Sequence, residues 1–449
     1  MAVTHPEETY TRAQTRDTGA KLNILVVFFL FSLLVPLTIE LAGIKLLAYR
    51  AVALLLFFPA FIAWCRGQAG PRIFADYAMI GLSAWFIIAM VANHGLGVWQ
   101  TVGVHTAELL GCYLLGRAFV RTPVQFFKVA KLLVVCFSLL LPFALIEALT
   151  AQNVLLQLWS YVGSAFPDVD HEQRLGFDRV QGPFEHPIHF GVYGGALIGL
   201  ACYVYGYGRG VWGRIWRTGL VALTAFFSLS SGPLAAMTAQ FGLIAWDVIL
   251  RDVKSRWWIL AGLVAIWYVV IDILSNRTPI EVMISYFALN AQTGYGRILI
   301  FDYGMQNALA NPLFGIGFDD WIRPAWLTDS VDMFWIYYAM IAGLPAGFLV
   351  LAAYFGMMIS VIKRPLTDPK MRQYRMGWIV TMVGLFMAGW MVHFWKVPFV
   401  LYCFLLGAAG WFLTYKPDAI SDDVKDPQDE RKFNYTRFPV RRGRQTESF

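Results

Sequence analysis

The stretches LNILVVFFLFSLLVPLTI (residues 22–39) and AVALLLFFPAFIAW (residues 51–64) decide the fold class of this chain. Each approaches the ~20 apolar residues that a helix needs to cross ~30 Å of hydrocarbon. Transmembrane β-barrels contain only short alternating segments, so these long runs predict helices. The composition agrees, because 58% of the 449 residues are hydrophobic and 14% are charged, whereas soluble proteins average about 25% charged residues.

Similar apolar runs recur along the chain and predict an all-α polytopic membrane protein with about 12 transmembrane helices. We expect a cytoplasmic N-terminal tail (1–21), a membrane domain (22–414) and a basic cytoplasmic C-terminal tail (415–449). The predicted spans are 22–41, 47–65, 75–93, 103–120, 131–150, 187–206, 218–232, 234–250, 257–274, 333–361, 377–395 and 397–414.

The distribution of basic residues predicts the orientation. With both termini inside, the inner segments hold 28 of the 36 Lys and Arg residues and the outer segments hold 8. This bias is the positive-inside signature of a membrane protein. The net charge of +7 therefore indicates cytoplasmic loops and a lipid-facing tail rather than a nucleic-acid partner.

Two connections are long, and both are predicted to lie outside: about 151–186 and about 275–331. Long ordered loops in a compact architecture are usually functional. The second contains GRILIFDYGMQNAL (296–309), in which Ile298, Leu299, Phe301, Met305 and Leu309 have roughly the spacing of one helical face. We expect an amphipathic helix on the membrane surface, ended by Asn311-Pro312.

Arginines are concentrated in these two loops, although the positive-inside bias disfavours them there. They are Arg174, Arg179, Arg277, Arg297 and Arg323. Guanidinium groups bind phosphate oxygens bidentately and keep their charge, so the sequence indicates an anion site. Arg297 opens its helix and is the preferred ligand, whereas Arg323 is expected to pair locally with Asp319 or Asp320.

Other polar residues have more than one interpretation. His186 and His189 are three residues apart, and a general base and a structural histidine are both open for them. A metal pair lacks a third ligand at suitable spacing, so no metal or other cofactor is expected.

Several acids and one histidine are placed near the outer ends of spans. Solvation at the interface is the favoured interpretation of each, although together they indicate a polar cavity open to the outside. They are Glu40, Glu108, Glu147, Asp272 and His393. No phosphate-binding Gly-Lys-Ser/Thr loop occurs in the cytoplasmic connections, which argues against ATP-driven transport encoded in this chain.

Four segments between about residues 180 and 360 resemble one known family in order and in membrane placement. They are VQGPFEHPIHFGVYGGALIGLA (180–201), FSLSSGPLAAM (227–237), GYGRILIFDYGMQNALANPLFGIGFDDW (294–321) and VDMFWIYYAMIAGLPAGFLVL (331–351). They are similar to segments of bacterial O-antigen ligases and of Wzy-type O-antigen or exopolysaccharide polymerases.

The resemblance implies a GT-C-like fold in the bacterial inner membrane and a metal-independent glycosyltransferase acting on the periplasmic face. The donor would be a glycan on undecaprenyl diphosphate, and the partners would be membrane lipid and polysaccharide assembly proteins such as a flippase or a chain-length regulator. An anionic lipid-anchored leaving group should meet arginines at the mouth of a membrane cavity.

The resemblance also assigns roles by position. Arg297 resembles the loop arginine that engages the diphosphate, and either Arg174 or Arg179 would be its partner from the first loop. Arg277, in the second loop, is a further candidate for substrate binding. The base that activates the acceptor hydroxyl could be His189, His186 or Asp332.

Two departures from the family pattern bear on the activity. Ser231 stands where many members carry Arg, and DSVDMFW (329–335) lacks the His that ligases usually carry. The second departure favours a polymerase of lipid-linked repeat units over a ligase that delivers glycan to lipid A–core. From another class, a transporter of lipid-linked saccharides is the further alternative.

Overall fold

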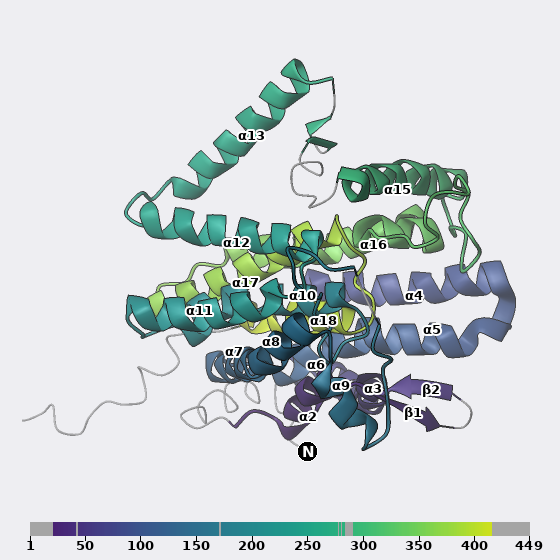
Figure 1. Cartoon of the computed structure of the whole chain (residues 1–449), viewed down its shortest axis with the longest axis horizontal. Helices are drawn as coiled ribbons and strands as arrows, with labels where there is room; N and C mark the ends of the chain where they lie inside the picture. The colour runs from purple at the N-terminus through teal and green to yellow at the C-terminus, as the bar shows by residue number, and fades with distance from the viewer. Residues whose placement is uncertain are drawn as a thin grey trace, which may run out of the picture. The chain divides into compact units, whose positions relative to one another are not determined.

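A computed structural model describes residues 21–41, 44–169, 172–276, 278–279, 281–282 and 291–414, with only the backbone described at 39–41, 44–45 and 291–293. These residues belong to one compact unit, Gly19–Tyr415. The structure is 71% helical with little sheet (Figure 1). The α-helices are α2 (Ile24–Ser32), α3 (Ala48–Cys65), α4 (Phe74–His94), α5 (Trp99–Thr106), α6 (Cys112–Phe119), α7 (Pro123–Ser138), α8 (Leu141–Thr150), α9 (Val154–Ser160), α10 (Pro187–Gly195), α11 (Val211–Phe226), α12 (Ser231–Ile249), α13 (Arg256–Leu274), α15 (Ala291–Ala310), α16 (Phe334–Lys363), α17 (Pro369–Gly389), α18 (Val397–Ala408) and α19 (Gly410–Thr414).

Short helical segments of other types and a small sheet complete the architecture. A 3-10 turn, η2 (Gly95–Val98), and two π-helical segments, η3 (Ala107–Gly111) and η4 (Leu200–Tyr205), continue neighbouring α-helices. Three strands form one small antiparallel sheet in the order β2-β1-β3. They are β1 (Leu37–Leu41), β2 (Ile44–Leu47) and β3 (Ser164–Ala165), with Ile39 opposite Leu46 and Leu37 opposite Ala165.

Eight helical segments of the described residues are long and apolar enough to cross a membrane. The chain is therefore compatible with a polytopic membrane protein, while a count of 12 spans stays a prediction. One of the eight, Phe74–Phe119, contains two predicted spans, 75–93 and 103–120, joined at η2. The predicted spans 218–232 and 377–395 fall on α11 and α17, which are not among the eight.

The expectation of a purely helical span over residues 22–41 is wrong. Helix α2 ends at Ser32, and β1 begins at Leu37. Pro36 lies between them; it has no N–H to donate and disfavours a helical conformation at the residue before it. The apolar run therefore divides into a helix and a strand, and the sheet is an addition to the all-α architecture.

The connections between the helices gather at two ends of the bundle. Aromatic rings bring several of them together: the Phe126 ring lies 6.3 Å from that of Tyr374 and 5.6 Å from that of Trp411, and Tyr207 lies 5.9 Å from Tyr374. The end of the bundle that holds these rings is called the basic end, because each connection there contains Lys or Arg. These connections are 66–73, 120–122, 206–210, 250–255 and 364–368. The long connections lie at the opposite end, the loop end.

Helices α6 and α18 approach each other so closely that only glycine fits at the contact. A Cβ on Gly407 would lie 1.9 Å from the Tyr113 carbonyl oxygen, and one on Gly116 would lie 2.3 Å from that of Phe404. Small residues allow such close backbone packing between membrane helices. The same region buries an ion pair, in which the Arg117 Nε lies 3.1 Å from the Asp76 Oδ1.

Helix α15 contains the predicted 296–309 segment and ends before Asn311-Pro312, as expected, but it begins at Ala291, so the prediction that Arg297 opens the helix is wrong: Arg297 lies in the second turn. Its apolar face packs against α16 (Figure 1), where Ile300 joins Ile336 and Met340 in one cluster. Leu309 does not belong to that face, because it is 62% exposed. The position of α15 relative to the membrane surface stays a prediction.

A break in α16 binds the turn that follows α15. Gly343 has φ +82°, and Pro345 has no N–H, so carbonyls of the preceding turn have no helical donor. The Met340 and Ile341 carbonyls instead accept hydrogen bonds of 2.9 Å from the N–H groups of Ile316 and Gly317. Two of the family-like segments, 294–321 and 331–351, are thus joined through their backbones.

This junction should not tolerate a side chain at Gly343. A Cβ there would lie 1.9 Å from the Leu313 carbonyl oxygen, and the φ angle is one that glycine alone adopts readily. We expect Gly343→Ala to lower the unfolding free energy by ~2 kcal/mol or more, visible as a lower thermal unfolding temperature of the purified protein in detergent. Gly262→Ala in α13, where nothing lies within 4 Å of the added Cβ, is the matched control; an equal effect of both changes would contradict the explanation.

The two ends should be reachable from opposite sides of the membrane. Tyr161 at the loop end is 89% exposed, and the side chain of Arg251 at the basic end is 77% exposed. From the positive-inside bias, we expect a membrane-impermeant thiol reagent to label Tyr161→Cys on intact spheroplasts and Arg251→Cys only after permeabilisation. Labelling in the reverse order would invert the predicted orientation.

Candidate functional site

The connection between α11 and α12 is a tight turn at the loop end, residues 227–231, which we call the serine turn. Its sequence is Phe-Ser-Leu-Ser-Ser, and every member is buried. Leu229 has φ +45°, a left-handed conformation that costs a non-glycine residue ~1–2 kcal/mol. The turn is therefore fixed by its surroundings rather than by local preference.

Two of the predicted arginines bind this turn from the first long loop. The Arg174 Nη1 donates to the Leu229 carbonyl at 2.9 Å, and the Arg179 Nη2 donates to the Ser230 Oγ at 2.9 Å. The Val180 N–H adds a backbone bond of 2.9 Å to the Phe227 carbonyl. Burial, with the neighbouring charge of Arg174, lowers the pKa of Arg179 to about 10.

The third arginine reaches the same turn from α15. The Arg297 Nε donates to the Met391 carbonyl at 2.8 Å, and its Nη2 contacts the Ser231 Oγ at 3.4 Å. The side chain is 7% exposed, and its Nη1 has no hydrogen-bond partner among the residues that the structure describes. Burial lowers the pKa of this guanidinium, with an opposing contribution from Asp332 and a further lowering from Arg174.

Asp332 lies just before α16 and within electrostatic range of Arg297. The Ser330 hydroxyl donates to its Oδ1 at 2.6 Å. Burial raises the pKa of Asp332, which the Ser330 hydrogen bond and the Arg297 charge partly offset. A carboxylate with a raised pKa is a stronger proton acceptor than an ordinary aspartate.

The two histidines at the start of α10 have different environments. The His186 Nδ1 accepts the Ile188 N–H at 3.1 Å, so this ring caps the helix. The His189 ring lies 6.0 Å from it and is 8% exposed. A nitrogen that accepts a backbone hydrogen bond is not available to take a proton, which leaves His186 the weaker base candidate.

His393 is a site residue that the sequence did not single out as functional. It is buried between α17 and α18, within electrostatic range of His189, and its Nδ1 has no partner among the described residues. Its ring lies 3.9 Å from the Trp395 ring and 4.2 Å from that of Tyr337. Only the fold places it here, because more than 200 residues separate it from His189.

Two cavities meet at Tyr337, next to His393. One, of about 460 Å³, lies between the segment after α15 and α16, and carries Trp321, Trp395 and three carboxylates. The other, of about 300 Å³, is lined by His105, Glu108 and Arg50. Aromatic rings and carboxylates are side chains suited to the C–H faces and hydroxyl groups of a saccharide.

The remaining predicted polar residues have local partners or lie elsewhere. Arg277 and the side chain of Glu40 are outside the described residues, and Asp272 is exposed on α13. Arg323 pairs with Asp320, which confirms its predicted local pairing, although that segment is not helical.

Two of the buried acids have satisfied structural roles. Glu108 pairs with Arg50 at 2.6 Å, and Glu147 accepts the Gln181 N–H at 2.7 Å. Glu147 thereby holds the first long loop against α8, next to the segment that binds the serine turn. Both acids are enclosed by protein rather than solvated at an interface.

The described residues therefore bring together three guanidinium groups, one carboxylate and three imidazoles at the loop end. No group of three or more His, Cys, Asp or Glu side chains suited to a metal ion occurs within the described ranges. An anion with several oxygens is the ligand that this donor set fits, since guanidinium groups only donate.

No protein-family model matches the chain, and no curated protein matches it significantly.

Proposed function

We propose that this protein transfers a glycan from undecaprenyl diphosphate to a sugar hydroxyl at the loop end of the bundle, as a polysaccharide polymerase. The observation that carries the proposal is the convergence of Arg174, Arg179 and Arg297 on the serine turn. An unpartnered buried guanidinium nitrogen is costly. The Arg297 Nη1 has no hydrogen-bond partner among the described residues, and a diphosphate oxygen would supply one.

The proposed step is a displacement at the anomeric carbon of the donor. The acceptor hydroxyl oxygen forms a bond to this carbon, the bond from the carbon to the diphosphate oxygen breaks, and the diphosphate leaves with the electron pair. The hydroxyl proton passes to a base. Guanidinium groups placed where this negative charge develops lower the barrier without a metal ion.

We infer that Asp332 is the base. It lies near Arg297, where the leaving group would be held, and burial raises its pKa. His186 is committed to capping α10. His189 is buried and lies within electrostatic range of His393, and these two side chains would orient the acceptor.

The polymerase assignment rests on the sequence DSVDMFW (329–335), where ligases of the similar family usually carry a histidine. The acceptor would be the non-reducing sugar of the next lipid-linked repeat, held by the aromatic and acidic side chains of the cavity beside Tyr337. A ligase would instead release the carrier's glycan onto lipid A–core. Gel analysis of lipid-linked glycan and of lipid A–core in a null strain separates the two.

Removing the arginine of α15 should abolish polymer. We expect Arg297→Ala to lower transfer at least 100-fold, since one lost oxyanion donor costs ~3 kcal/mol, and polymer length on the carrier measures it. Arg323→Ala is the matched control, because Arg323 pairs with Asp320 and should be dispensable.

Because Arg297 also binds Met391, folding must be checked separately. Thermal unfolding in detergent and the variant Arg297→Lys, which retains the charge, serve this purpose. Polymer of normal length from a folded Arg297→Ala protein would contradict the proposal.

The base assignment predicts a pH dependence. Transfer requires the Asp332 carboxylate, so the rate should fall as the pH drops through a pKa raised above the usual aspartate range. Asp332→Asn should lower the rate ~100-fold or more and remove this acidic limb of the pH–rate profile.

His186→Asn is the control for the base assignment, since asparagine also caps a helix. Near-normal transfer is expected from it, as measured with purified lipid-linked repeat. Loss of activity in His186→Asn together with normal activity in Asp332→Asn would exchange the two roles.

A further inference from the structure

A large cavity lies at the basic end, far along the helices from the serine turn. Its volume is about 780 Å³, and residues of α11, α12, α13 and α17 line it. Its charged members are four arginines and one aspartate: Arg214, Arg256, Arg372, Arg375 and Asp247. Most of the remaining lining is apolar or aromatic, so the cavity has a cationic part and an apolar part.

The single aspartate does not neutralise the cationic part. Asp247 is paired with Arg256 at 2.9 Å and also accepts the Tyr203 hydroxyl at 2.8 Å. Three arginines are thus left without a carboxylate in the lining. The exposed Arg372 has no hydrogen-bonded or ion-paired side-chain partner among the described residues.

The other two arginines bind only neutral oxygens. Arg214 donates to the Gln373 amide oxygen at 3.2 Å, and Arg375 donates to the carbonyls of Ile362 and Arg364. Burial and the like charge of Arg372 lower the pKa of Arg375. An anion in the cavity would relieve this repulsion.

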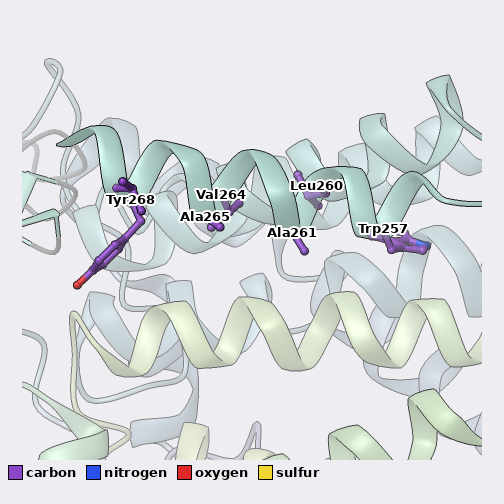
Figure 2. Close-up of a pocket in the computed structure, with 7 residues that line it drawn as sticks. Trp257, Leu260, Ala261, Val264, Ala265 and Tyr268 are labelled. Carbon is purple, nitrogen blue, oxygen red and sulfur yellow. The ribbon is translucent and has the colours of Figure 1, made fainter. Parts of the chain in front are cut away.

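The apolar part of the cavity continues along one face of α13. This helix buries none of its residues in the described structure. Seven of them line a hollow of about 640 Å³ that is almost wholly apolar: Trp257, Leu260, Ala261, Val264, Ala265, Tyr268 and Val269. Figure 2 shows side chains of this lining on the helix. Trp257, Leu260 and Ala261 also line the cationic cavity, so the two spaces adjoin.

We propose that an anionic phospholipid binds in this continuous space, with its phosphate on Arg214, Arg372 and Arg375 and its acyl chains along α13. Charge complementarity selects the headgroup, since basic pockets between membrane helices favour anionic lipids. A soluble phosphate would use the arginines but not the apolar face, and a zwitterionic lipid would leave the excess positive charge uncompensated. The site is independent of the glycosyl transfer proposed for the loop end.

Native mass spectrometry of the full chain in detergent tests the proposal, with phosphatidylglycerol and phosphatidylcholine of identical acyl chains as probes. The intact protein should retain phosphatidylglycerol preferentially. Arg372→Glu should weaken that retention about five-fold or more, and Ala261→Trp, which fills the exposed apolar part, should weaken it without changing the charge.

Each variant has a matched control outside the space. Arg251→Glu reverses a charge on the neighbouring connection, and Leu263→Trp enlarges another face of α13; both should bind like the parent protein. Equal retention of the two lipids, or an unchanged affinity in Arg372→Glu, would overturn the proposal. The proposal would also be overturned if glycerol phosphate displaced the lipid and Ala261→Trp left lipid retention unchanged. That result would identify a soluble anion as the ligand.

Discussion

A buried guanidinium group must find oxygens for its donors, and this requirement organises the loop end of the molecule. The half-buried Arg174 and Arg179 donate to the serine turn, and the buried Arg297 contacts the same turn while donating to the Met391 carbonyl; its Nη1 has no partner among the described residues. Leu229 keeps a left-handed conformation within that turn. Three like charges around neutral oxygens leave an excess positive field, and an anionic ligand would find it already assembled.

The position of Arg297 depends on a second constraint, the interruption of α16. Backbone groups released at Gly343 and Pro345 bind the chain just after α15, so the arginine-bearing helix is attached to α16 at its C-terminal end. The bond from Arg297 to Met391 attaches its other end to the segment after α17. Asp332, just before α16, is thereby held near the same guanidinium.

The sequence predicted most helices, because long apolar runs and the turn residues between them are local signals. It also predicted α15 and the arginines around the serine turn, since arginine on the outer side of a membrane protein is unusual. It missed β1, where Pro36 overrides hydropathy, and the Asp76–Arg117 pair, and it gave His393 only as one of several polar residues near the outer ends of spans. Those groups acquire their roles through contacts between distant segments, which periodicity does not encode.

The junction at the break in α16 also separates α15, whose position is fixed, from the chain between Gly317 and Phe334, whose length can vary. Ile316 and Gly317 are bound at Met340 and Ile341, less than two turns from the start of α16, so the chain between Gly317 and Phe334 leaves and returns at nearly the same place. The entropy of closing such an excursion grows only slowly with its length. Insertions in this segment would change the wall of the neighbouring cavity, which Asp319, Asp320 and Asp329 help to line, while α15 keeps its position against α16.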